Sequence, residues 1–143
     1  MIDWGKCSSP VSAHFTVSEC LYLPKWNRLA NEHDGLNDEI KGNLILLCTK
    51  LDTVRDFFKK PMIVHCMYRP KEYNSLIGGA VGSAHIEGLA IDFHVINRSC
   101  DEVREMLLPL LEQWKFRMED LPGSNWVHLD LRDPGYGNRF FKP

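Results

Sequence analysis

The chain has 143 residues, a length that suits one domain over residues 1–143, and its content of 44% hydrophobic and 25% charged residues is ordinary for a globular protein. The net charge of −2 gives no general attraction to nucleic acid or to an anionic membrane. No apolar run is long enough to span a bilayer, and the N-terminal segment lacks the pattern of a secretory signal. We therefore expect a monomer that is cytoplasmic as synthesised and binds neither nucleic acid nor membrane.

The first half of the chain contains one strong helical pattern. Residues 1–16 predict an irregular arm, and Thr16 or Ser18 can cap a short helix at 17–22. Over 36–59, apolar residues recur at helical spacing with charged residues between them. This pattern predicts a long helix with one face on the core.

Two strand-like segments follow in the middle of the chain. The sequence MIVHCM at 62–67 predicts a short buried strand, in which Cys66 would be a small core residue. A short helix is expected at 71–77, followed by a glycine-bearing loop up to residue 83. The β-rich sequence LAIDFHVI predicts a second strand at 89–96.

The last third predicts a second long helix, a strand and an irregular tail. The helix runs from about residue 99 to 116, and Pro109 should kink or split it. The alternating sequence WVHLDLR predicts a third strand at 126–132. Helices and strands do not alternate regularly, so we expect an α+β domain: a small antiparallel sheet with helices packed on one side.

Polar residues of the second and third strands share a face of the predicted sheet. Asp92 and His94 point to one side of their strand, and so do His128 and Asp130 of theirs. His85 arrives from the loop just before the second strand. Two histidines and one carboxylate with an open fourth position form a catalytic zinc arrangement. The alternative is a solvated loop histidine and a strand aspartate bonded to backbone.

Several motifs in this region occur together and in a fixed order. The pattern S-x-H-x-x-G-x-A-x-D is formed by Ser83, His85, Gly88, Ala90 and Asp92. Upstream and downstream stand Tyr68, Arg69, Tyr73, Asn74, the Gly78–Ala80 loop, Trp126, His128 and Asp130. In these motifs the chain resembles the zinc D-Ala-D-Ala carboxypeptidase and L-alanyl-D-glutamate endopeptidase family, which shares its fold with the Hedgehog signalling domain.

The resemblance implies a role for each matching residue. His85, Asp92 and His128 match the ligands of a zinc ion (Zn2+), and Arg69 matches the arginine that binds substrate and stabilises the oxyanion. It further implies hydrolysis of a peptidoglycan stem peptide, by a carboxypeptidase or an endopeptidase. The absence of a secretory signal would suit a phage lysis enzyme (endolysin) that acts on the cell wall after release. It would equally suit a part of a virion.

One position departs from the family pattern. Family members commonly carry a glutamate or aspartate as general base three residues before the last zinc histidine, where this chain has Asn125. Asp130 could be the base, because it shares a strand face with His128. Glu119 or Asp120 could reach in instead. The third possibility is a weak or inactive zinc-binding module for cell-wall binding or virion assembly.

Overall fold

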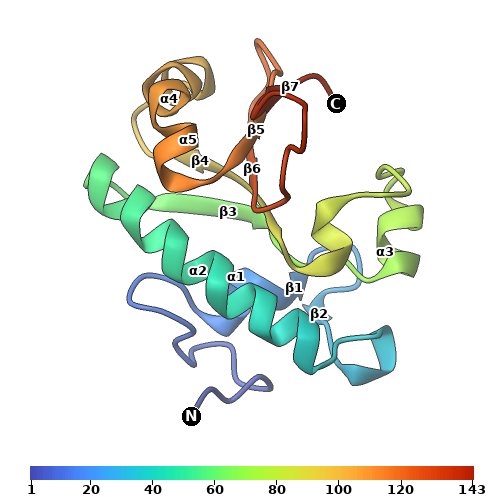
Figure 1. Cartoon of the computed structure of the whole chain (residues 1–143). Helices are drawn as coiled ribbons and strands as arrows, with labels where there is room; N and C mark the ends of the chain where they lie inside the picture. Colours follow the sequence, from blue (N-terminus) through green and yellow to red (C-terminus); the bar gives the residue numbers. More distant parts are fainter.

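The computed structural model describes residues 1–143 and places most elements near their predicted bounds (Figure 1). The α-helices and short 3-10 helices are α1 (Val17–Leu21), η1 (Glu32–Asp34), α2 (Asp38–Phe58), α3 (Lys71–Leu76), η2 (Ala84–Glu87), α4 (Cys100–Leu107), η3 (Leu108–Leu110) and α5 (Leu111–Trp114). The strands are β1 (Tyr22–Leu23), β2 (Arg28–Leu29), β3 (Met62–Cys66), β4 (Ala90–Val95), β5 (Arg117–Glu119), β6 (Val127–Asp130) and β7 (Phe140–Phe141).

Local sequence signals set the ends of the predicted helices. The Thr16 N–H donates to Glu19 Oε1 at 3.0 Å, the reciprocal contact of a capping box at the start of α1. Asn37 Oδ1 accepts from the Ile40 N–H at 2.9 Å at the start of α2. The predicted break at Pro109 is confirmed, because the helical segment there divides into α4, η3 and α5.

The larger sheet has five strands in the order β3-β4-β6-β5-β7. All neighbouring strands are antiparallel except β5 and β7, which pair in parallel. The predicted α+β class with a small antiparallel sheet is confirmed, and the short strands β5 and β7 extend that sheet beyond the prediction. A separate two-stranded sheet joins β1 to β2.

The two faces of the larger sheet differ in chemistry. One face contributes Ile91, Phe93 and Leu129 to a cluster of 28 buried hydrophobic residues, which also contains the apolar positions of α1, α2 and α4. Figure 1 shows α2 lying across the sheet next to β3. The opposite face carries the polar residues of β4, β5 and β6, so the helices leave one face of the sheet available for a functional site.

A β-bulge in β3 changes the residues that β3 presents to the polar face. Ile63 pairs with His94 and Val64 with Phe93, but the next pair joins Cys66 to Asp92, which leaves His65 as an extra residue. Cys66 therefore lies on the same face as Asp92 and is half-buried. The prediction that Cys66 is a core residue is wrong, because strand alternation is broken one residue before it.

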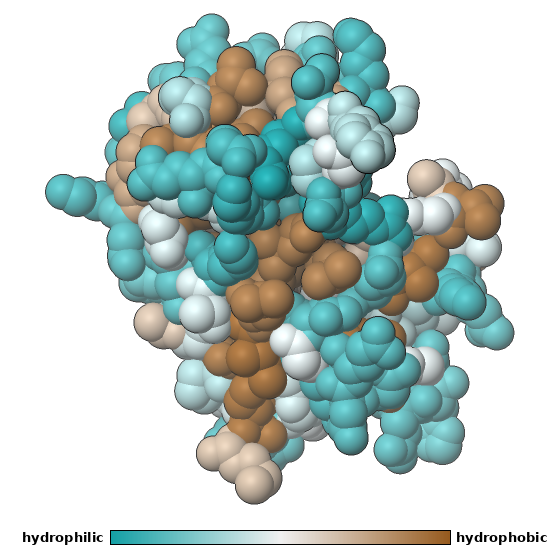
Figure 2. Space-filling view, viewed as in Figure 1, coloured by the Kyte–Doolittle hydropathy of each residue, from teal (hydrophilic) through white to brown (hydrophobic).

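The surface is mixed in polarity. Figure 2 shows hydrophobic side chains gathered in a band that runs from the middle of the view to its lower edge, with polar side chains on both sides. The exposed hydrophobic residues of α2 are Ile45, Leu46 and Phe57. None of the helices combines the length and the apolar character needed to cross a membrane.

Candidate metal centre

Strands β4 and β6 bring the first two predicted ligands together. Asp92 and His128 are direct partners across the antiparallel pair. His128 Nδ1 lies 2.9 Å from Asp92 Oδ1, and both residues are at least nine-tenths buried. Because the two strands are central in the sheet, this geometry follows from backbone pairing and not from a mobile loop.

The third predicted ligand comes from η2, directly before β4. The Ser83 hydroxyl accepts from the His85 N–H at 3.2 Å, and Gly88, with φ of +71°, turns the chain into the strand. The Arg69 N–H donates to the His85 carbonyl at 3.0 Å. His85 Nε2 then lies 3.1 Å from Asp92 Oδ1, the same oxygen that His128 approaches.

Each ring also has a hydrogen-bond partner on the side away from Asp92. His85 Nδ1 lies 2.7 Å from the Met67 carbonyl, which can only accept a hydrogen bond, so this nitrogen carries the proton. His128 Nε2 lies 2.9 Å from Asp130 Oδ2 and donates to that carboxylate. When both rings are neutral, these two protons leave His85 Nε2 and His128 Nδ1 with lone pairs that point toward Asp92.

Three electron-pair donors that meet in one buried place can hold a cation. His85 Nε2 is buried and has no hydrogen-bond partner, even though Asp92 is close. A buried polar atom without a partner is costly and calls for an explanation. Two neutral imidazole nitrogens and a carboxylate oxygen are the donor set of a catalytic zinc site, so these residues fit that metal.

The electrostatics of the buried groups agree with this assignment. Burial disfavours the charged form of His85, yet the Asp92 carboxylate and Cys66 outweigh burial and raise its pKa to about 10. Burial likewise opposes charge on His128, and hydrogen bonds to Asp130 and Asp92 raise its pKa. The pKa of Asp92 lies below its usual range because the two histidines outweigh its burial. Without a metal ion the site would take up protons in its place.

A cavity of about 440 Å³ opens onto these residues. Its lining includes His65, Cys66, Arg69, Tyr73, Ser83, His85, Asp92, Glu119, Trp126 and His128. The Arg69 guanidinium lies 3.1 Å from Asp92 Oδ2 and 3.3 Å from Asn74 Oδ1. A fixed positive charge therefore lies in the cleft beside the candidate metal ligands.

The two carboxylates considered as bases have different surroundings. Asp130 is fully buried and is held by Arg117, whose Nε and Nη2 lie 2.8 and 2.9 Å from its oxygens. Glu119 lines the cleft, and its Oε1 lies 3.7 Å from His128 Nε2. Burial and the nearby Asp92 and Asp130 carboxylates raise the pKa of Glu119, although His128 opposes the shift.

Cys66 adds a further donor to the cleft. Its Sγ lies 3.6 Å from His85 Nδ1 and 3.8 Å from Asp92 Oδ2. Cys66, His85 and Asp92 form a group whose possible ligand atoms all lie within 4.8 Å of one another. The sequence could not show that Cys66 lies beside His85 and Asp92, because the bulge in β3 is what places its thiol on the polar face.

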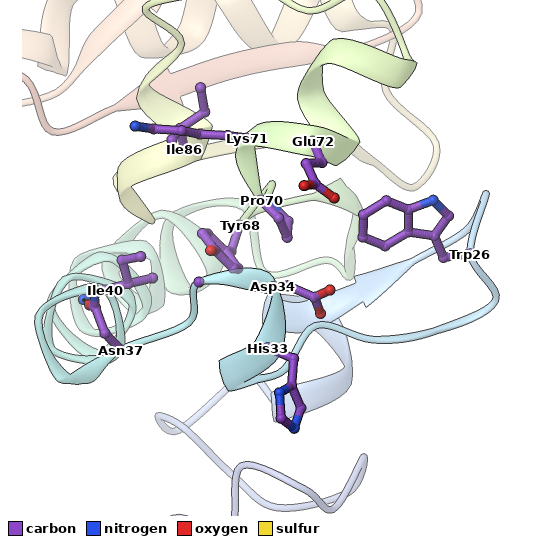
Figure 3. Close-up of a pocket in the computed structure, with 11 residues that line it drawn as sticks. Trp26, His33, Asp34, Asn37, Ile40, Tyr68, Pro70, Lys71, Glu72 and Ile86 are labelled. Carbon is purple, nitrogen blue, oxygen red and sulfur yellow. Dashed lines mark hydrogen bonds between the residues drawn. The ribbon is translucent and has the colours of Figure 1, made fainter.

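Asn125 and the pocket around Tyr68 lie outside this cleft. Asn125 lines a separate hollow with His94, Arg98 and Ser124, and is not part of the cleft lining. A cavity of about 430 Å³ lies on the other side of the segment that carries Arg69. Figure 3 shows Tyr68 within it and Trp26 at one end. Its only histidine, His33, has no second histidine or cysteine beside it in the lining, so we do not place the metal chemistry there.

An α+β domain with histidine and carboxylate donors in a cleft on the open face of its sheet has the architecture of a metallopeptidase. The profile of the Peptidase M15 family matches residues 13–130. The chain therefore belongs to the Peptidase M15 family, whose members are zinc-dependent peptidases. The resemblance in the sequence is thus confirmed at the level of the family. No curated protein matches the chain.

Proposed function

We propose that this M15 family protein is a zinc peptidase that hydrolyses the stem peptides of bacterial peptidoglycan. The observation that carries the proposal is the convergence of His85 Nε2 and His128 Nδ1 on one oxygen of Asp92, in a cleft that also holds Arg69. We propose His85, Asp92 and His128 as the zinc ligands. The ion would supply a Lewis acid that activates water and polarises the peptide carbonyl.

Arg69 is proposed to bind the negative charge that develops on the substrate. Its guanidinium lies in the cleft, where Asp92 and Asn74 hold two of its nitrogens in place. A positioned donor of this kind stabilises an oxyanion by about 3 kcal/mol in other hydrolases. A terminal carboxylate of a short peptide is a second anionic group that the same side chain suits.

Glu119 is proposed as the proton-transfer group, in preference to Asp130. Glu119 reaches the cleft, whereas Asp130 is fully buried and its oxygens are already bound by Arg117 and His128. A base must lie within reach of the water that it deprotonates. Glu119 would accept that proton and pass it to the leaving amine. Asp130 would instead hold His128 in the tautomer that leaves Nδ1 free.

The substrate proposal has two versions that differ in the bond cut. A carboxypeptidase would remove the terminal D-alanine of the stem pentapeptide, and an endopeptidase would cut after its L-alanine. In either version we propose that the protein acts on the cell wall after release from the cell, as a phage lysis enzyme does, or as part of a virion.

Mass spectrometry of a stem-pentapeptide digest tests the proposal. Zinc-loaded protein is incubated with the peptide beside a chelated sample and beside the Arg69→Ala variant. Loss of one alanine, or a cut after L-alanine, in the zinc-loaded sample alone would support one of the two versions. An intact peptide with protein that demonstrably holds zinc would contradict the peptidase proposal and favour a binding module.

A further inference from the structure

A pair of histidines on the polar face of the sheet has no part in the proposed peptide hydrolysis. His65 Nε2 lies 2.7 Å from His94 Nδ1, with the ring centroids 5.0 Å apart and the planes at 61°. Neither ring makes another hydrogen bond within the protein. Both rings are at least partly exposed, so the pair is accessible from solvent.

The pair owes its position to the bulge in β3. His94 faces the polar side of β4, directly opposite Ile63, and His65 is the extra residue that follows. A bulge typically re-aims a side chain next to a functional site. His94 stands two residues from Asp92 on the same face, which corresponds to about 7 Å along the strand. His65 also lines the cleft.

Two facing imidazoles are suitable donors for a transition metal. Imidazole nitrogen binds zinc, copper and nickel ions. Two nitrogens on one tetrahedral zinc ion stand about 3.3 Å apart, given zinc–nitrogen bonds of about 2.0 Å. The present separation of 2.7 Å is that of a hydrogen bond, so the exposed His65 ring and the half-buried His94 ring must turn for both nitrogens to face one ion. Water can fill the remaining coordination positions, because the pair is open to solvent.

We propose that His65 and His94 form a second metal site, for a divalent transition ion such as Zn2+, at the edge of the cleft. The site offers two protein donors and solvent exposure, against three buried donors at the first site. It should therefore bind more weakly and fill after the first site is saturated. This inference goes beyond the proposed function and does not require that the protein be a peptidase.

Equilibrium dialysis against Zn2+, with the bound metal measured by mass spectrometry, tests the second site. Metal-free protein is dialysed against rising free Zn2+, for the wild type and for the His65→Gln and His94→Gln variants. The wild type should bind two ions, one tight and one weaker. Each variant should keep the tight ion and lose the weaker one, with an unchanged circular dichroism spectrum.

Two further variants make the stoichiometry interpretable. His85→Ala should lose the tight ion and keep the weaker one, which separates failure of the first site from failure of the second. His14→Gln is a matched control, since His14 is also a partly exposed histidine but pairs with Asp56. It should still bind two ions. One bound ion in the wild type, or two in both His65→Gln and His94→Gln, would overturn the second site.

Discussion

At the scale of single residues, the proposed proton transfer depends on which carboxylate reaches the cleft. Glu119→Gln keeps the size of the side chain and removes its ability to take a proton. We expect kcat to fall by about 10²–10⁴-fold, the usual contribution of a general acid–base residue. Steady-state kinetics on the stem peptide measure this, with zinc content as the control. Turnover near that of the wild type would contradict the role of Glu119.

Asp130 should show a different response to the matching substitution. Asp130→Asn keeps the shape of the side chain but weakens its hold on the His128 Nε2 proton. A partner of this kind typically contributes about 10–100-fold in metal affinity. We expect the tight zinc affinity to fall by that factor in a competition assay with a chromophoric chelator. Unchanged affinity together with lost turnover would return the role of base to Asp130.

The sequence points to the residues that the structure brings together in the candidate centre, and the structure adds their surroundings. Strand alternation indicates Asp92 and His128, the loop before the strand supplies His85, and the structure brings the three together. The sequence leaves Glu119 as one of several alternatives for the base. Its position in the cleft depends on the pairing of β5 with β6, and the three residues of β5 carry no readable strand pattern. Cys66 was misplaced because no sequence signal marks the bulge.

At the scale of elements, the turn between η2 and β4 depends on Gly88. A Cβ there would lie 3.1 Å from the carbonyl oxygen of Ile40 in α2, on a backbone with φ of +71°. Gly88→Ala should therefore add an overpacking cost of about 1–3 kcal/mol to the cost of a left-handed backbone. Urea unfolding of the metal-free protein measures the total loss of stability.

Gly78→Ala is the matched control for this substitution. Gly78 has a similar φ of +75°, but a Cβ there would meet nothing within 4 Å. The substitution should lower the free energy of unfolding only by the cost of a left-handed backbone conformation for alanine, about 1–2 kcal/mol. Equal losses for the two variants would show that the contact between the turn and α2 does not limit stability.

Element prediction succeeded where the pattern was long and failed where it was short. Apolar spacing over six turns identified α2, and Pro109 correctly marked the break after α4. The strands β5 and β7 were missed, because segments of three and two residues carry no readable alternation. Arg117 of β5 lies over the Phe141 ring of β7 at 4.1 Å, a contact made only in three dimensions.

At the scale of the whole molecule, the metal should stabilise a fold that does not depend on it. The buried core of 28 residues contains none of the three proposed zinc ligands. A ligand present at about a thousand times its Kd stabilises the native state by about 4 kcal/mol. Chelation should therefore lower Tm and leave a cooperative transition in calorimetry. An unchanged Tm would argue against metal binding.

The metal-free protein should lose stability as the pH rises. The pKa of His85 is raised from 6.5 to about 10, so its protonated form favours the folded state. This contribution is complete below about pH 6.5 and disappears as the pH approaches 10. Urea unfolding at pH 6 and pH 9 should show the decrease. His85→Gln should flatten it, and an equally steep decrease in that variant would assign it to other groups.

His65, the extra residue in β3, could be lost without disturbing the strand pairing around it, and the proposed site of His65 and His94 would be lost with it. Without His65, the pairs Val64–Phe93 and Cys66–Asp92 would follow one another in an unbroken ladder. Deleting a single codon would therefore leave both faces of the sheet unchanged and remove one metal donor.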